Sequence, residues 1–148
     1  TEQRCRTLLE NTPGEKPFAL LLLDVDNFKQ TNDRYGHPKG DAVLRCLGEN
    51  LSGLFRRDDV VGRVGGDEFL MMMPGAGGEQ AVGRARKIAQ EMCRSVSVQC
   101  GVDVSGSIGV VLSKPGACAY EELLRRADSA LYAAKAAGKG CYRVYGGA

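Results

Sequence analysis

Three carboxylates stand at positions in the chain where they could act together. Asp24 closes an unbroken apolar run, Phe18–Leu23, while Asp67 and Glu68 follow a Gly-Gly pair between two short β-prone runs. Carboxylates brought together without a partner raise one another's pKa and lose solvation, so a divalent cation is their natural partner. Oxygen ligands without a histidine nearby favour Mg²⁺ or Mn²⁺, ions that usually bind together with phosphates.

The glycines before these carboxylates fit a binding turn. Gly65 and Gly66 carry no Cβ, so a bulky substrate could lie against the chain there. Each feature alone has an ordinary alternative: a Gly-Gly-Asp-Glu turn is more often just solvated, and an Asp that ends a strand is more often a cap. Their occurrence together favours a functional site over these alternatives.

The elements around these residues predict an α+β fold: a mixed, mostly antiparallel sheet covered by helices. Phe18–Leu23 does not alternate, which is typical of a central strand buried on both faces. The next helix opens at Gly40, with Asp41 near its N-terminus, and the polar stretch before it, 27–39, is expected to be irregular. The other expected elements are an initial helix, a hairpin of Val60–Val64 and Phe69–Met73, a helix over Ala81–Met92, strands over Val96–Cys100 and Val104–Leu112, a helix over Leu123–Ala134 and a strand over Cys141–Tyr145.

Length and composition fit one domain. The 148 residues include 20 Lys+Arg and 18 Asp+Glu, so the net charge is 20 − 18 = +2, which argues against nucleic-acid binding through the bulk field. The longest apolar run is far shorter than the roughly 20 residues of a membrane-spanning helix. The six cysteines are scattered, and Cys46 and Cys93 fall in helical apolar patterns, which indicates reduced thiols in a cytosolic compartment. With one histidine and no Cys-x-x-Cys, the sequence supports neither a zinc site nor a redox dithiol.

The run Gly65-Gly66-Asp67-Glu68-Phe69 resembles the signature of the GGDEF domains, typically diguanylate cyclases. Three further segments resemble the family in the expected order. They are 24–41, beginning Asp24-Val25-Asp26-Asn27-Phe28-Lys29, then Ser107-Ile108-Gly109, and then 127–139. The resemblance runs from Phe18 to Tyr145 and implies an architecture similar to the palm and nucleotidyl cyclase (ferredoxin-like) folds. The family's opening Leu-Thr-Gly-Leu segment is absent, so we expect residues 1–148 to be a single domain, truncated at its N-terminus and cut from a longer sensory protein.

The resemblance implies a role for each matching residue. Asp24, Asp67 and the Val25 carbonyl would hold Mg²⁺ or Mn²⁺, and Glu68 would be a second acid at the reacting hydroxyl. The guanine residues would be Asn32 and Asp41. The triphosphate would be cradled, beside the turn of Gly65 and Gly66, by the backbone N–H groups of Asn27 and Phe28 and by Lys29, Lys135 and Lys139.

The two C-terminal lysines have an alternative interpretation. Lys135 and Lys139 are four residues apart, so the predicted last helix would point both ammonium groups the same way. Without the resemblance, the preferred interpretation of this pair would be a solvated lysine face. The family often has Gly-Arg-Asn here, whereas this chain has Gly138-Lys139-Gly140, which keeps the charge and loses a guanidinium fork.

An Arg-x-x-Asp, formed by Arg56 and Asp59, lies nine positions before the signature when counted from Arg56. In the family this spacing marks the inhibitory site for the product, cyclic di-GMP, since guanidinium groups grip phosphates and stack on guanine. A second basic group from Arg86 or Lys87 would complete the site. The alternative is a charged helix end before a strand.

The implied activity is that of a diguanylate cyclase. Two GTP-loaded domains in a homodimer would condense two GTP into cyclic di-GMP, release two pyrophosphates and be inhibited by product. A catalytically silent GGDEF module that binds GTP or cyclic di-GMP is the alternative, and the complete carboxylate set favours the enzyme. The resemblance also implies an upstream sensory domain and a cytoplasmic place for this domain, and it leaves open whether the full-length protein is membrane-anchored.

Overall fold

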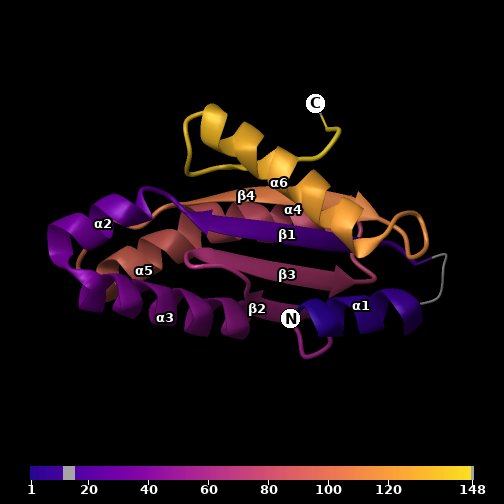
Figure 1. Cartoon of the computed structure of the whole chain (residues 1–148), viewed down its shortest axis with the longest axis horizontal. Helices are drawn as coiled ribbons and strands as arrows, with labels where there is room; N and C mark the ends of the chain where they lie inside the picture. Colours follow the sequence, from indigo (N-terminus) through magenta and orange to yellow (C-terminus); the bar gives the residue numbers. More distant parts are fainter. Residues whose placement is uncertain (12–15, 148) are drawn as a thin grey trace.

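The structure, a computed structural model, describes residues 1–11 and 16–147 (Figure 1). Within these residues five strands form one sheet in the order β2-β3-β1-β4-β5. Every pairing is antiparallel except that of β4 with β5, which confirms the predicted mostly antiparallel α+β fold. The strands are β1 (Phe18–Val25), β2 (Val60–Arg63), β3 (Glu68–Pro74), β4 (Gly106–Ser113) and β5 (Tyr142–Val144).

The central strand β1 contributes side chains to two hydrophobic cores, one on each face of the sheet. Leu21 and Leu23 pack against apolar side chains of α3, α4 and α5, while Leu20 and Leu22 pack against α1 and α6. Figure 1 shows α6 and α3 on opposite sides of the sheet. Because both faces of β1 are covered, an unbroken apolar run is what this position requires.

Seven helical segments surround the sheet in the described residues. They are α1 (Glu2–Asn11), α2 (Phe28–Tyr35), α3 (His37–Leu54), α4 (Gly78–Lys87), the π-helical turn η1 (Ile88–Met92), α5 (Cys93–Cys100) and α6 (Tyr120–Ala136). The helices α4, η1 and α5 follow one another without a break.

Two parts of the predicted element order are wrong. The strand expected over Val96–Cys100 is helix α5, because Cys93 and Val96, one helical turn apart, are buried while Val98 is 80% exposed. The polar stretch expected to be irregular contains helix α2, which has no buried residue and packs against α3. Its position therefore comes from tertiary contact rather than from an apolar face of its own.

Two expectations about helix ends are also corrected. Helix α3 begins at His37 with Pro38 in its first turn, so Asp41 lies inside the helix and does not cap it. Helix α6 ends at Ala136, so Lys139 lies beyond it, with a left-handed φ of 65°. Lys135 and Lys139 therefore do not share a helix face.

All six cysteines are free, as predicted, and Cys5 and Cys93 are buried. Burial raises the pKa of the Cys93 thiol to about 11, which keeps it protonated near neutral pH. In the part of the chain that the structure describes, no helix is long and apolar enough to cross a membrane.

Candidate functional site

Backbone pairing between β1 and β3 brings the three carboxylate residues to one end of the sheet. Asp24 is paired with Glu68 in the register of the two strands. The Val25 N–H donates a hydrogen bond to the Asp67 carbonyl at 3.1 Å, which holds the turn beside the end of β1. Residues separated by more than 40 positions in the sequence thus meet through the sheet.

Charge is crowded at this end of the sheet. Burial raises the pKa of Asp24 and the charge of Asp67 adds to this, while a hydrogen bond from Lys135 opposes it. Burial also raises the pKa of Glu68, followed by the charges of Asp24 and Asp128. Burial lowers the pKa of Lys135, but its hydrogen bond and the negative charges around it more than compensate, so the pKa is raised. The site therefore favours a positive charge among its carboxylates.

In the described part of the chain, Asp24, Asp67 and Glu68 lie at one end of the sheet without completing a metal site by themselves. Among residues 1–11 and 16–147, no three Asp, Glu, His or Cys side chains form a ready-made metal site. The ammonium of Lys135 lies 2.7 Å from Asp24 Oδ2 and supplies the neutralising charge instead. Asp24 and Asp67 stay close enough for the charge of Asp67 to raise the pKa of Asp24.

The residues nevertheless fit a divalent cation. Asp24 Oδ1 is buried and has no hydrogen-bond partner, so one oxygen of this carboxylate is uncommitted. Mg²⁺ usually takes only one or two protein carboxylates and completes its shell with water and phosphate oxygens. Asp24 with Asp67 satisfies that requirement, and Glu68 need not be a ligand.

The Gly-Gly turn leaves space on its outer side. A Cβ added to Gly66 would meet no atom within 4 Å, whereas one added to Gly65 would lie 2.9 Å from Glu68 Oε1. The guanidinium of Arg63 donates to the carbonyl oxygens of Gly65 and Gly66, the closest contact being 2.7 Å to Gly66. These bonds fix the turn in place and leave its surface open.

The two predicted guanine residues come from neighbouring helices. Asn32 lies on α2 and packs against Gly40 of α3, where an added Cβ would stand 1.8 Å from Asn32 Oδ1. That oxygen is buried without a hydrogen-bond partner. Asp41 follows Gly40 directly and is exposed, lining a hollow of about 460 Å³ together with Arg63. Gly40 thus allows α2 to approach α3 closely, and Asp41 is the next residue of α3.

The predicted triphosphate residues lie around the end of β1. The Lys139 ammonium donates a hydrogen bond to Asn27 Oδ1 at 2.8 Å, across 112 residues of sequence. Lys29 is exposed, and the Phe28 ring packs against the core, so Phe28 offers only its backbone. Lys135 and Lys139 therefore reach the same strand end from different elements, one from α6 and one from the turn after it.

A comparison with protein families matches residues 1–141 to the family described as diguanylate cyclase, GGDEF domain. The chain belongs to this GGDEF family.

Curated relatives share much of the GGDEF sequence. The chain is 34% identical over 137 residues to the probable diguanylate cyclase DgcT of Escherichia coli. It is 37% identical over 142 residues to the diguanylate cyclase TpbB of Pseudomonas aeruginosa. These alignments cover 90% and 94% of this chain but only 30% and 33% of the relatives. The chain therefore spans about a third of the length of these relatives.

Solved GGDEF structures share the fold. The GGDEF domain of TpbB from P. aeruginosa matches with a TM-score of 0.85 at 34% identity, covering 97% of this chain and 92% of that one. The GGDEF domain of DgcB from Caulobacter crescentus, solved in complex with c-di-GMP, matches with a TM-score of 0.82 at 27% identity, covering 99% and 86%.

Three of the four residues predicted for GGDEF product inhibition line a second hollow, of about 310 Å³, between β3 and α4: Arg56, Asp59 and Lys87. Asp59 is buried, and its Oδ2 accepts a hydrogen bond from the Arg56 N–H at 2.8 Å, which shapes the turn before β2. Arg56 is exposed, and Lys87 lines the same hollow.

The other predicted basic group of this second hollow lies elsewhere. Arg86 donates a hydrogen bond to the Tyr142 hydroxyl at 3.2 Å and does not line the hollow. Arg84, which the sequence did not single out, does line it; its guanidinium donates to the Leu54 carbonyl and stacks on the Phe55 ring at 4.9 Å. The orientation of α4 decides which of these two arginines lines the hollow, and the sequence did not determine that orientation.

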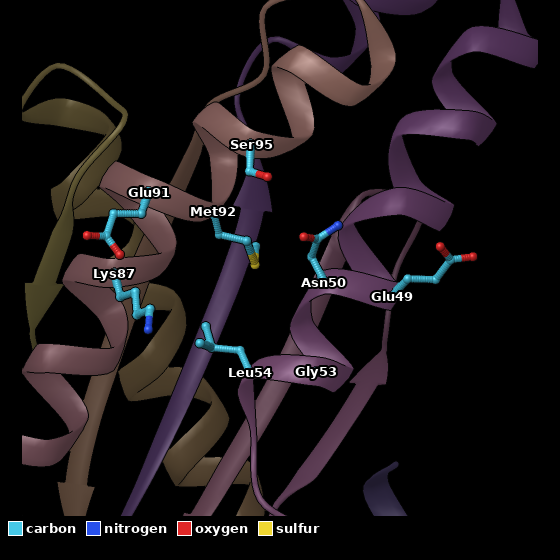
Figure 2. Close-up of a pocket in the computed structure, with 8 residues that line it drawn as sticks. All are labelled: Glu49, Asn50, Gly53, Leu54, Lys87, Glu91, Met92 and Ser95. Carbon is cyan, nitrogen blue, oxygen red and sulfur yellow. The ribbon is translucent and has the colours of Figure 1, made fainter.

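Figure 2 shows a third hollow, of about 480 Å³, between α3 and the continuous helix α4–η1–α5. Leu54 and Met92 supply apolar walls, and Glu49 and Glu91 stand at its rim. Lys87 borders both this hollow and that of Arg56. None of the residues predicted to bind the metal, guanine or triphosphate lines it, so this hollow is separate from the candidate site at the end of β1.

Two further acidic residues near the site had no predicted role. Asp128 of α6 is exposed, yet its charge helps to raise the pKa of Glu68. Asp26 is buried next to the end of β1, with a side chain that is fully inaccessible. Both stand inside the segments that resemble the family, but only the fold shows what they face.

Proposed function

We propose that this domain is a diguanylate cyclase that condenses two GTP into cyclic di-GMP with the release of two pyrophosphates. One observation carries the proposal. In the described residues two buried side-chain atoms lack a hydrogen-bond partner, Asp24 Oδ1 and Asn32 Oδ1. Buried polar atoms are nearly always paired, so unpaired ones mark places where a ligand completes the site. These two belong to the residues assigned to the metal and to guanine.

Each candidate site residue then has a distinct role in the proposed reaction. Asp24 and Asp67 would hold Mg²⁺ or Mn²⁺, which when bound polarises the α-phosphate and lowers the pKa of the attacking 3′-hydroxyl. Glu68, whose pKa is raised by burial, is suited to accept a proton from that hydroxyl. Lys135 and Lys139 bring two positive charges to the end of β1, where the triphosphate would lie.

The proposed reaction needs two copies of the domain. Each copy presents one nucleotide, and the 3′-hydroxyl of each GTP attacks the α-phosphate of the other, so each attack forms one phosphodiester bond and expels one pyrophosphate. Activity would therefore depend on a homodimer. Product inhibition through Arg56, Asp59 and Lys87 belongs to the same proposal, supported by the basic hollow that they line.

The experiment compares wild type with Asp67→Asn, which removes one charge from the site and keeps the side-chain size. Both proteins are incubated with GTP and Mg²⁺, and cyclic di-GMP is quantified by mass. We expect synthesis to fall by orders of magnitude in the variant while its melting temperature stays near that of wild type. Near-normal synthesis by Asp67→Asn would remove this residue from the proposed mechanism.

The same experiment distinguishes an active enzyme from a catalytically silent receptor module. Wild type would then bind GTP or cyclic di-GMP, for example in a calorimeter, and form no product at any protein concentration. The length of the curated relatives supports the further proposal that this domain is part of a longer protein, and the sequence resemblance is what suggests an upstream sensory domain and a cytoplasmic place.

A further inference from the structure

The buried carboxylate of Asp26 connects three parts of the chain. Ser107 Oγ donates to its Oδ1 at 2.6 Å, and Ser105 Oγ donates to its Oδ2 at 2.8 Å. The backbone N–H of Gly140 donates to the same Oδ2 at 2.9 Å. The end of β1, the start of β4 and the turn after α6 are thus held by one side chain that is itself inaccessible to solvent.

The turn that Asp26 holds is under backbone strain. Gly138, Lys139 and Gly140 all have positive φ, at 119°, 65° and 61°. Lys139 has a Cβ, so its left-handed conformation is unfavourable and must be enforced by its surroundings. In the described residues the other non-glycine with positive φ is Asn27, at 54°, and its Oδ1 accepts the hydrogen bond from Lys139.

Both strained residues lie next to a group that adjoins Asp26. Asn27 follows Asp26 directly, and Lys139 precedes the Gly140 amide that Asp26 holds. Lys135 approaches the same carboxylate, its ammonium lying 3.7 Å from Asp26 Oδ1. Because Gly138 and Gly140 are free to adopt many conformations, releasing the Gly140 amide would let Lys139 leave its place over the end of β1.

We infer that Asp26 is a positioning residue, which holds the 138–140 turn so that Lys139 meets the phosphate chain of a bound nucleoside triphosphate. This inference rests on the proposed function, because it takes GTP as the ligand. Asp26 touches neither the guanine nor the reacting atoms in this account. Its loss therefore weakens binding of the triphosphate and spares binding of the base.

The test uses Asp26→Ser, which is too short to hold the Gly140 amide but leaves a hydroxyl for the two neighbouring serines. We expect the dissociation constant for GTP to rise roughly tenfold or more, the size of one lost charge-assisted contact, with guanosine binding changed by less than about twofold. Asp26→Asn is the matched control. Its amide oxygen can accept from Gly140 while Ser107 accepts from its amide nitrogen, so GTP affinity should return most of the way to that of wild type.

Hydrogen exchange of the Gly140 amide in wild type gives a measurement that does not depend on the folding of a variant. The amide should be protected, and in Asp26→Ser it should exchange faster. A freely exchanging Gly140 in wild type, unchanged GTP affinity in Asp26→Ser, or equal losses of GTP and guanosine binding would each overturn the inference. Wild type that binds no GTP would instead overturn the proposed function, and the triphosphate role with it.

Discussion

Gly109 of β4 is the position where one added methyl group should do the most damage. A Cβ there would stand 2.2 Å from the Ala127 carbonyl oxygen and 2.6 Å from the Leu131 nitrogen. Both are backbone atoms of α6, so no side-chain rotation can relieve the overlap. Gly109→Ala therefore forces α6 away from the sheet by about 1 Å, since non-bonded atoms need more than 3 Å.

The size of the effect follows from this displacement. Overpacking a closely packed interior costs about 1–3 kcal/mol, and an overlap with backbone belongs at the upper end, near about 3 kcal/mol. For a domain of this length each kcal/mol lowers the melting temperature by roughly 2–4 °C, so we expect a fall of about 6–12 °C. The shift should also draw Lys135 of α6 away from Asp24, since their atoms now lie only 2.7 Å apart.

Thermal unfolding measures the effect, with Gly83→Ala as the matched control. Gly83 lies in the middle of α4, and a Cβ there would meet no atom within 4 Å. That variant should be stabilised by up to about 1 kcal/mol, because alanine favours a helix more than glycine does. If Gly109→Ala melted within about 2 °C of wild type, the close packing of α6 on β4 would be refuted.

Three further predictions concern ligands and pH. Arg56→Ala should abolish calorimetric binding of cyclic di-GMP and leave GTP affinity unchanged; unchanged product binding would remove the inhibitory site. ATP should compete poorly with GTP, because adenine lacks the donor pair that a carboxylate accepts, and Asp41→Ala should weaken GTP far more than ATP; equal binding of ATP and GTP by wild type would contradict the guanine assignment. Hydrogen bonds from Arg125 and Arg126 lower the pKa of Glu122 from 4.5 to about 2, so its stabilising effect is complete above pH 4.5 and lost as the pH falls toward 2. The melting temperatures of wild type and Glu122→Gln should converge over that range, and a constant gap between them would contradict the assignment.

The sequence predicted those elements whose burial has a clear pattern. The unbroken Phe18–Leu23 run identified β1 because both faces of that strand are covered. The spacing of Val43, Leu47 and Leu51 identified α3 because one face of this helix is buried. Where burial leaves no pattern the prediction failed: α2 buries no residue, and its start follows a left-handed Asn27 rather than a capping side chain.

The arrangement of the candidate site residues in space could not be predicted from the sequence. The Val-x-Val alternation in 96–98 resembles a strand, but Cys93 and Val96, one helical turn apart, are the buried residues of a helix. Lys139 was expected beside Lys135 on one helix, and it reaches the site instead through a strained turn that Asp26 holds. Such long-range contacts leave no periodic signal in a sequence.

Diguanylate cyclase activity is tested most directly by the nucleotide product of the wild-type protein. The protein is incubated with GTP and Mg²⁺, and both cyclic di-GMP and pyrophosphate are quantified over time. We expect two pyrophosphates for every cyclic di-GMP, with a rate that rises faster than linearly with protein concentration because two copies must meet. GTP that stays intact at every protein concentration, in the presence of Mg²⁺ or Mn²⁺, would contradict this activity.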